Sequence, residues 1–196
     1  MKKLFMIAAM MVATLSANAQ NEVGQWSIKP MAGVNLATMT KSDGGKMRVG
    51  LTAGAEFAVG AAENFEISFG ALYSQQGIKA SGIIEGMNVD ATLKLDYINI
   101  PVLANYYVAP GLAIKAGIQP GFNVVKKAKA EAAGVSEEAT VDDAKGFALS
   151  VPVGLSYEFS NFVLDARYNW GITKAIKELD TKHSYFTITL GYKLPL

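Results

Sequence analysis

The residues able to do chemistry are few in this sequence. Its 196 residues include no cysteine and a single histidine, His183. The lack of cysteine excludes thiolate nucleophiles, disulfides and cysteine-bound metal, and one histidine excludes a multi-histidine metal site. His183 precedes Ser184, with Glu178 and Asp180 nearby, so the ingredients of a surface lipid hydrolase or acyltransferase are present. Neighbours in a strand point to opposite faces, so His183 and Ser184 would not act together if they lay in a strand. We interpret His183 as a solvated loop residue and expect no catalytic, cofactor-binding or metal-binding residues.

A second constellation consists of charged residues on one face of alternating segments. Five are basic and four are acidic, so their formal charges nearly cancel. Buried charges need opposite charges and hydrogen bonds, so we predict a salt-bridged network from which Arg48 stands apart. An ion or proton path is the alternative, and Glu56 with Glu66 could act as a carboxylate pair. The predicted network comprises Lys29, Arg48, Glu56, Glu66, Lys115, Glu158, Asp165, Arg167 and Lys193.

Apolar and polar residues alternate in the segments that carry these charges. A period of two is typical of a strand with two different faces. The fourth segment changes phase near Asp96 or Tyr97, which predicts a β-bulge there. Eight antiparallel strands are therefore predicted, at residues 26–36, 47–59, 65–76, 92–108, 112–124, 147–159, 162–172 and 185–194.

The connections between these segments alternate in length. Those at 37–46, 77–91, 126–145 and 173–183 are long, whereas those at 60–64, 109–111 and 160–161 are short. Such alternation places every long connection at one end of an up-and-down barrel, as in outer-membrane barrels. The charged, alanine-rich connection at 126–145 is interpreted as a mobile solvated loop that could bind a surface ligand or partner.

The apolar face decides between lipid and water. The chain is 51% apolar, yet no Asp, Glu, Lys or Arg falls on the apolar face of these segments. Arg or Lys on a lipid-facing position near the midplane costs about 2–4 kcal/mol. Aromatic residues also gather near the strand ends, where membrane interfaces favour them. We therefore predict an all-β, eight-stranded antiparallel up-and-down transmembrane β-barrel rather than a soluble β-sandwich.

The first residues have the pattern of an export signal. Lys2 and Lys3 precede an uncharged core at residues 4–15, and Ala17-Asn18-Ala19 matches a cleavage site. The core is shorter than the about 20 residues of a transmembrane helix. We predict a cleavable signal peptide at 1–19 and a barrel domain at 20–196. The formal charge of +1 gives no reason to expect nucleic acid as a partner.

One stretch carries a family resemblance. The sequence LDYINIPVL, from Leu95 to Leu103, resembles a strand of the PorT-type outer-membrane β-barrel proteins of the Bacteroidetes. Supporting matches are GVNL at 33–36, YSQQG at 73–77 and RYNWGI at 167–172. The resemblance implies an outer-membrane barrel in a family whose namesake is tied to a protein secretion system. Asn99 stands where the family often has Glu, and the final residues, GYKLPL, lack a terminal aromatic residue.

These observations favour a small outer-membrane barrel with a packed lumen and a structural or surface-interaction role. The alternatives are an envelope barrel that supports protein secretion through partners, a surface lipid-modifying enzyme and a narrow pore. The expected partners are outer-membrane lipid, the barrel-assembly machinery and envelope proteins.

Overall fold

The computed structural model describes residues 21–40, 45–84, 87–132, 135–141, 143–175 and 181–196; the predicted signal peptide lies outside these ranges. No helix in the described ranges is long and apolar enough to cross a membrane. The strands are β1 (Trp26–Met39), β2 (Gly45–Ala62), β3 (Phe65–Ile84), β4 (Met87–Asn99), β5 (Val102–Ala109), β6 (Leu112–Ala132), β7 (Val135–Thr140), β8 (Phe147–Phe159), β9 (Phe162–Lys174), β10 (Lys182–Tyr192) and β11 (Leu194–Pro195).

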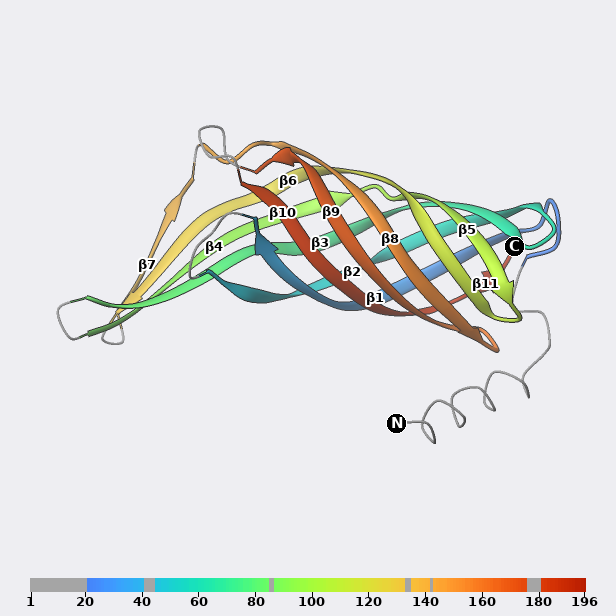
Figure 1. The fold of residues 1–196 in the computed structure, drawn as a ribbon, viewed down its shortest axis with the longest axis horizontal. Coiled ribbons are helices and arrows are strands. Elements are labelled where there is room, and N and C mark those ends of the chain that lie inside the picture. Colours follow the sequence, from blue (N-terminus) through green and yellow to red (C-terminus); the bar gives the residue numbers. More distant parts are fainter. Residues whose placement is uncertain (1–20, 41–44, 85–86, 133–134, 142, 176–180) are drawn as a thin grey trace.

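The strands form one antiparallel sheet that closes on itself (Figure 1). Closure comes from β1, which pairs with β2 on one side and with β10 on the other. Strands β4 and β5 share one position, because both pair with β3 and β6 across an interruption at Ile100 and Pro101. Strand β11 continues β10 along β1, and β7 pairs with β6 alone. The described strands therefore fill eight positions around a ring that has no open edge.

The hairpins at one end are longer than the sequence pattern predicts. Strand β3 runs to Ile84 and β4 starts at Met87, so most of the connection predicted at 77–91 is strand. Strand β6 likewise reaches Ala132 and pairs with β7, which makes the interpretation of 126–145 as a mobile loop wrong. Residues 127–132 alternate lysine or glutamate with alanine, a weak hydropathy contrast that conceals strand periodicity, whereas residues 77–84 show no regular alternation and begin with Gly77 at a φ of 129°. The β4–β6 register does shift between Asp96 and Tyr97, where a bulge is predicted, but the extra residue is Val124 on β6 and the β3–β4 register has no break there.

The short connections are tight turns at the opposite end of the ring. Asn64, Gly111 and Ser160 lie in these turns with positive φ values of 59°, 74° and 53°. The left-handed backbone region favours glycine and asparagine, which suits two of the three positions. Both the short turns and the C-terminus lie at the right-hand end in Figure 1, opposite the long hairpins.

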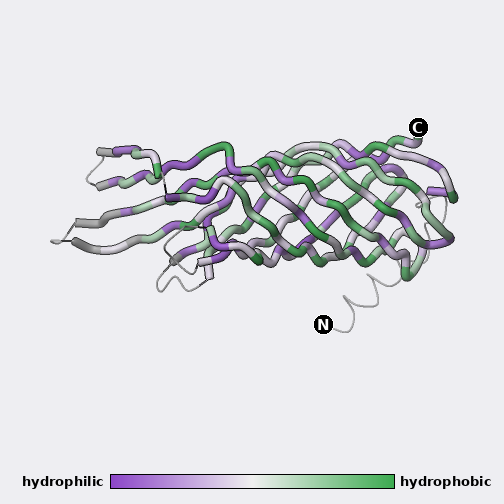
Figure 2. Tube along the Cα trace, turned by 90° about the horizontal axis from the view of Figure 1, so that it is seen from above, coloured by the Kyte–Doolittle hydropathy of each residue, from purple (hydrophilic) through white to green (hydrophobic). Residues whose placement is uncertain are grey.

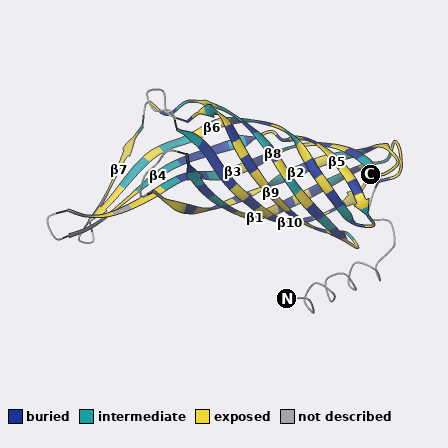
Figure 3. Cartoon of the chain, viewed as in Figure 1, coloured by how far each residue is buried: buried dark blue, intermediate teal, exposed yellow. Residues whose placement is uncertain are grey.

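The ring is polar inside and apolar outside (Figures 2 and 3). Along β9, Leu164 and Trp170 are 53% and 64% exposed, whereas the intervening Asp165 and Arg167 are 0% and 3% exposed. A water-soluble protein shows the reverse arrangement. Aromatic contacts on the outer face occur near the short turns and near the long hairpins, at Trp26–Phe69, Phe162–Tyr192, Phe122–Phe147 and Tyr168–Phe186.

An apolar cluster closes the interior near the long hairpins. We call it the apolar cap; its buried members are Met39, Leu95, Tyr97, Ala144 and Ala175. Leu95 and Tyr97 are fully buried, and as residues two apart in one strand they share its inner face. The interior therefore changes from polar to apolar along the axis of the ring.

Candidate functional site

The interior charges form a central cluster of five residues: Lys29, Glu56, Lys115, Asp165 and Arg167. The Arg167 guanidinium lies between the two carboxylates, with Nη2 2.5 Å from Glu56 Oε1 and Nε 2.6 Å from Asp165 Oδ1. Lys115 Nζ is 2.5 Å from Asp165 Oδ2, and Lys29 Nζ is 2.9 Å from Glu56 Oε2. Strands β1, β2, β6 and β9 supply these residues, so the cluster ties together much of the ring.

Strand register and glycine make room for the central cluster. Lys29 lies directly opposite Glu56 on the neighbouring strand. Gly154 on β8 is in register with both Lys115 and Arg167, whose long side chains occupy the space beside it. A Cβ atom at Gly154 would clash with the Ala166 carbonyl oxygen and lie 3.0 Å from Arg167 Cγ. A small inward-facing residue on one strand thus leaves room for the long charged side chains of the neighbouring strands.

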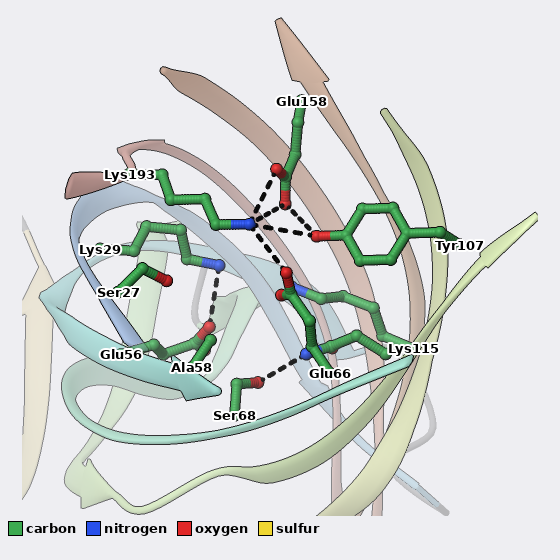
Figure 4. Close-up of a pocket in the computed structure, with 11 residues that line it drawn as sticks. Ser27, Lys29, Glu56, Ala58, Glu66, Ser68, Tyr107, Lys115, Glu158 and Lys193 are labelled. Atoms are coloured by element: carbon green, nitrogen blue, oxygen red, sulfur yellow. Dashed lines mark hydrogen bonds and ion pairs between the residues drawn. The ribbon is translucent and has the colours of Figure 1, made fainter. Parts of the chain in front are cut away.

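A mouth cluster lies nearer the short turns and comprises Glu66, Tyr107, Glu158 and Lys193 (Figure 4). Lys193 Nζ is 2.9 Å from Glu66 Oε1 and 3.1 Å from Glu158 Oε2. The Tyr107 hydroxyl donates to Glu158 Oε1 at 2.5 Å, and the Asn21 backbone N–H donates to Glu66 Oε1 at 2.6 Å. The chain before β1 therefore also contacts this cluster.

Glu56 and Glu66 do not form the acid–base pair considered from the sequence. Glu56 is in register with Gly70 and faces Lys29, whereas Glu66 is in register with Gly60 and faces Lys193. Each carboxylate is thus neutralised by its own cations. An ionised carboxylate that is held in this way is a poor proton acceptor.

Arg48 forms a third group, away from the other eight predicted residues. Its Nη1 atom is 3.0 Å from Asp96 Oδ1 and donates to the Gln76 carbonyl oxygen. The other carboxylate oxygen of Asp96 accepts a hydrogen bond of 2.8 Å from the Tyr73 hydroxyl. Asp96 was not among the predicted site residues, although the phase change beside it was a signal of unusual geometry.

Neutral polar side chains fill the interior between Arg48 and the central cluster. Asn35 Nδ2 donates to Ser74 Oγ, and Asn35 Oδ1 accepts from Thr187 Oγ1, both at 2.8 Å. Two spaces within the described part of the interior are small: about 20 Å³ beside the mouth cluster and about 10 Å³ beside Tyr185. A single water needs about 10–15 Å³. These two spaces therefore have room for isolated waters and no larger solute.

His183 is buried in β10 at 3% exposure, so its interpretation as a solvated loop residue is wrong. Its Nε2 atom is 2.9 Å from the Tyr97 hydroxyl, and the two rings meet edge to face. Burial follows from the start of β10 at Lys182 and from contact with the apolar cap. Ser184 points away and its Oγ lies 2.8 Å from the Tyr168 hydroxyl, whereas Glu178 and Asp180 lie outside the described residues. The geometry does not form a serine–histidine dyad.

The family comparison matches most of the chain. A family model described as outer membrane protein beta-barrel domain matches residues 18–177. No curated protein matches the chain.

Solved structures show a similar fold at low sequence identity. The Yersinia pestis attachment invasion locus protein Ail, in complex with the heparin analogue sucrose octasulfate, is 16% identical with a TM-score of 0.51. The match covers 88% of this chain and 100% of the Ail chain. Neisserial surface protein A is 13% identical, with coverage of 86% and 96% and a TM-score of 0.48, too low to support a structural argument. At this identity the likeness to Ail shows a common fold alone.

Proposed function

The chain belongs to the outer membrane protein β-barrel domain family, and from that premise we propose that it is a closed, non-conducting transmembrane barrel. The single observation that carries this proposal is the filled interior. Two charge clusters and the apolar cap occupy successive levels, and the enclosed spaces between them are about 10–20 Å³. A barrel of eight strands has an interior just wide enough for packed side chains.

The proposal includes the orientation and the export route. The eight ring positions would cross the outer membrane, with the short turns in the periplasm and the long hairpins outside, as is general for such barrels. The signal peptide at 1–19 would be removed after Ala19. Outer-membrane lipid would surround the apolar face, and the barrel-assembly machinery would insert the chain.

A structural or surface-interaction role fits this arrangement better than catalysis. The histidine is buried against Tyr97 and the neighbouring serine contacts Tyr168, so a hydrolytic dyad would need a rearranged strand. The β3–β4 and β6–β7 hairpins extend beyond the ring at the long-hairpin end (Figure 2), and their exposed charged residues include Lys79, Lys127 and Glu137. Such a surface suits contact with lipid or with another macromolecule.

The resemblance to PorT-type barrels of the Bacteroidetes supports a second candidate function. In that case the chain would support protein secretion through envelope partners. The resembling segment, Leu95 to Leu103, includes Leu95 and Tyr97 of the apolar cap and the interruption between β4 and β5. Recovery of a stoichiometric envelope protein with the native barrel would favour this second candidate.

Gel mobility of outer-membrane fractions tests the main proposal. A folded barrel should migrate differently with and without boiling, and N-terminal sequencing should begin at Gln20. In planar bilayers the refolded chain should give no single-channel current. Recovery of the chain as a soluble periplasmic protein with no heat-dependent shift would contradict the proposal, and a steady ion current would contradict the closed lumen.

A further inference from the structure

Lysines gather on the outer face of the ring at the end with the long hairpins. We call them the lysine collar; they are Lys46, Lys79, Lys94, Lys127, Lys129, Lys174 and Lys182. They lie just beyond the last exposed apolar side chains of the same face. On β3 and β4 Ile78 and Leu93 pack on the apolar cap, so the next pair outward, Lys79 with Thr92, and Lys46 opposite Lys79 lie on the outer side. On β9 Lys174 comes two residues after Ile172, which is 48% exposed. The collar therefore borders the exposed apolar band at its long-hairpin end.

Six of the collar lysines face one another directly across neighbouring strands. The registered pairs are Lys46–Lys79, Lys94–Lys127 and Lys174–Lys182. Side chains directly opposite in an antiparallel pair have Cβ atoms about 4.5–5.5 Å apart, and like charges there are destabilising. Three such pairs at one level are unfavourable unless anions lie between the lysines.

One pair has such an anion within the chain. Glu138 on β7 bridges the second pair, with Oε1 2.5 Å from Lys94 Nζ and Oε2 3.2 Å from Lys127 Nζ. The hydrogen bonds from Lys94 and Lys127 lower the pKa of the Glu138 carboxyl group, so it remains ionised. A carboxylate between two registered lysines is thus a geometry that this surface already uses.

The first pair has no such anion. Lys46 and Lys79 are both exposed, and within the described ranges neither has a carboxylate at ion-pair distance. From the contrast between the two pairs we infer that Lys46 and Lys79 together bind the phosphate of an anionic lipid headgroup in the leaflet around the long hairpins. Two phosphate oxygens would contact Lys46 and Lys79 in the way that the Glu138 carboxylate oxygens contact Lys94 and Lys127. This inference rests on the proposed membrane location and orientation.

Lipid retention by the full chain tests the inference. The protein is refolded in neutral detergent, mixed with micelles containing phosphatidylglycerol or phosphatidylcholine, and the bound lipids are counted by native mass spectrometry. We expect a preference for phosphatidylglycerol that high salt abolishes. A lysine near an anionic surface contributes about fivefold in affinity, so the Lys46→Gln/Lys79→Gln variant should bind phosphatidylglycerol roughly 25-fold more weakly.

The matched control is Lys94→Gln/Lys127→Gln, which removes the same charge from the same face. Its affinity should fall much less, because Glu138 already neutralises that pair. An equal loss in both variants would show attraction to bulk positive charge and would overturn the paired site.

Two further outcomes separate the possible failures. Competition by free glycerol phosphate at concentrations equal to those of the lipid would identify a soluble phosphate as the ligand and overturn the lipid assignment. The heat-dependent gel shift of the same samples reports on the barrel itself. A normal shift without preference for phosphatidylglycerol overturns the lysine site alone, whereas a wild-type chain with no shift overturns the barrel and the site together.

Discussion

Asp165 is the residue on which the interior charges converge. It is fully buried and lies within ion-pair distance of Lys115, Arg167 and Lys29, the last at 4.0 Å. The central cluster carries three positive and two negative formal charges, so each carboxylate is indispensable to it. Replacement by a neutral isostere would leave three buried cations around Glu56 alone.

Asp165→Asn should therefore destabilise the folded chain strongly. Removing one partner of a buried ion pair costs about 3–5 kcal/mol, because the other charge remains buried without compensation. Urea unfolding of the refolded protein in detergent measures the change in unfolding free energy. Asp143→Asn is the matched control, since Asp143 is exposed, and it should stay within about 0.5 kcal/mol of wild type.

A second substitution distinguishes charge from shape. Lys115 forms an ion pair with Asp165, so Lys115→Met/Asp165→Asn removes one charge of each sign and restores the original net charge of the cluster. The double variant should regain part of the lost unfolding free energy, with a coupling of about 0.5–3 kcal/mol. Additive losses would mean that the Lys115–Asp165 pair contributes little to stability.

Gly154 provides a residue-level test of packing. A Cβ atom there would lie 2.9 Å from Arg167 Cα, so Gly154→Ala must displace β9 or the Arg167 side chain. Overpacking of this kind costs about 1–3 kcal/mol, again measured by urea unfolding. Gly146→Ala is the control, because a Cβ at Gly146 meets nothing within 4 Å. Equal stability of both variants would show that the interior is loosely packed.

At the scale of elements, the sequence predicts the ring well and its extensions poorly. Strand β8 has the predicted bounds, because large apolar residues alternate there with small or polar ones. The sequence predicts loops at 77–84 and 126–132, because 77–84 shows no regular alternation and alanine beside lysine gives little hydropathy contrast in 126–132. The split between β4 and β5 was also missed. It depends on Pro101, which has no N–H for the ladder.

The candidate site was predicted in composition but not in its partners. Parity along each strand placed all nine charged residues on the inner face, where the structure buries them. Register determines which side chains meet, and the unbroken β3–β4 register places Asp96 opposite Gln75, beside the Gln76 carbonyl oxygen that Arg48 contacts. The search for charged residues on the inner face cannot find Tyr107 or Asn21, because neither side chain is charged. Asn21 also lies before the first strand.

The β3–β4 hairpin should be dispensable for folding where it projects beyond the ring. Ser81 lies opposite Asp90, so residues 82–89 can be replaced by Asn-Gly, the preferred two-residue hairpin turn. We expect the unfolding free energy to change by no more than about 1 kcal/mol, because exposed loop tips tolerate such changes. The heat-dependent gel shift and urea unfolding check this, and failure of the shortened chain to refold would assign the tip a role in assembly.

At the scale of the whole molecule, the lumen has two seals of different chemistry. The central and mouth clusters close it with ion pairs between strands, and the apolar cap closes it with Leu95, Tyr97 and their neighbours. Because the seals lie at different levels and share no member, opening one leaves the other intact. A blocked lumen therefore does not depend on any single side chain.

Ion current should appear only when both seals are removed. One variant replaces Glu56, Lys115, Asp165 and Arg167 of the central cluster and Glu158 and Lys193 of the mouth cluster with serine, which removes three charges of each sign. A second variant carries Leu95→Ala and Tyr97→Ala. Each should remain silent in planar bilayers, whereas the combined variant should conduct, because water can then enter along the whole axis. The heat-dependent gel shift must first show that each variant is folded. Current through either separate variant would show that the remaining seal does not close the lumen, and silence of the folded combined variant would place a further barrier elsewhere along the axis.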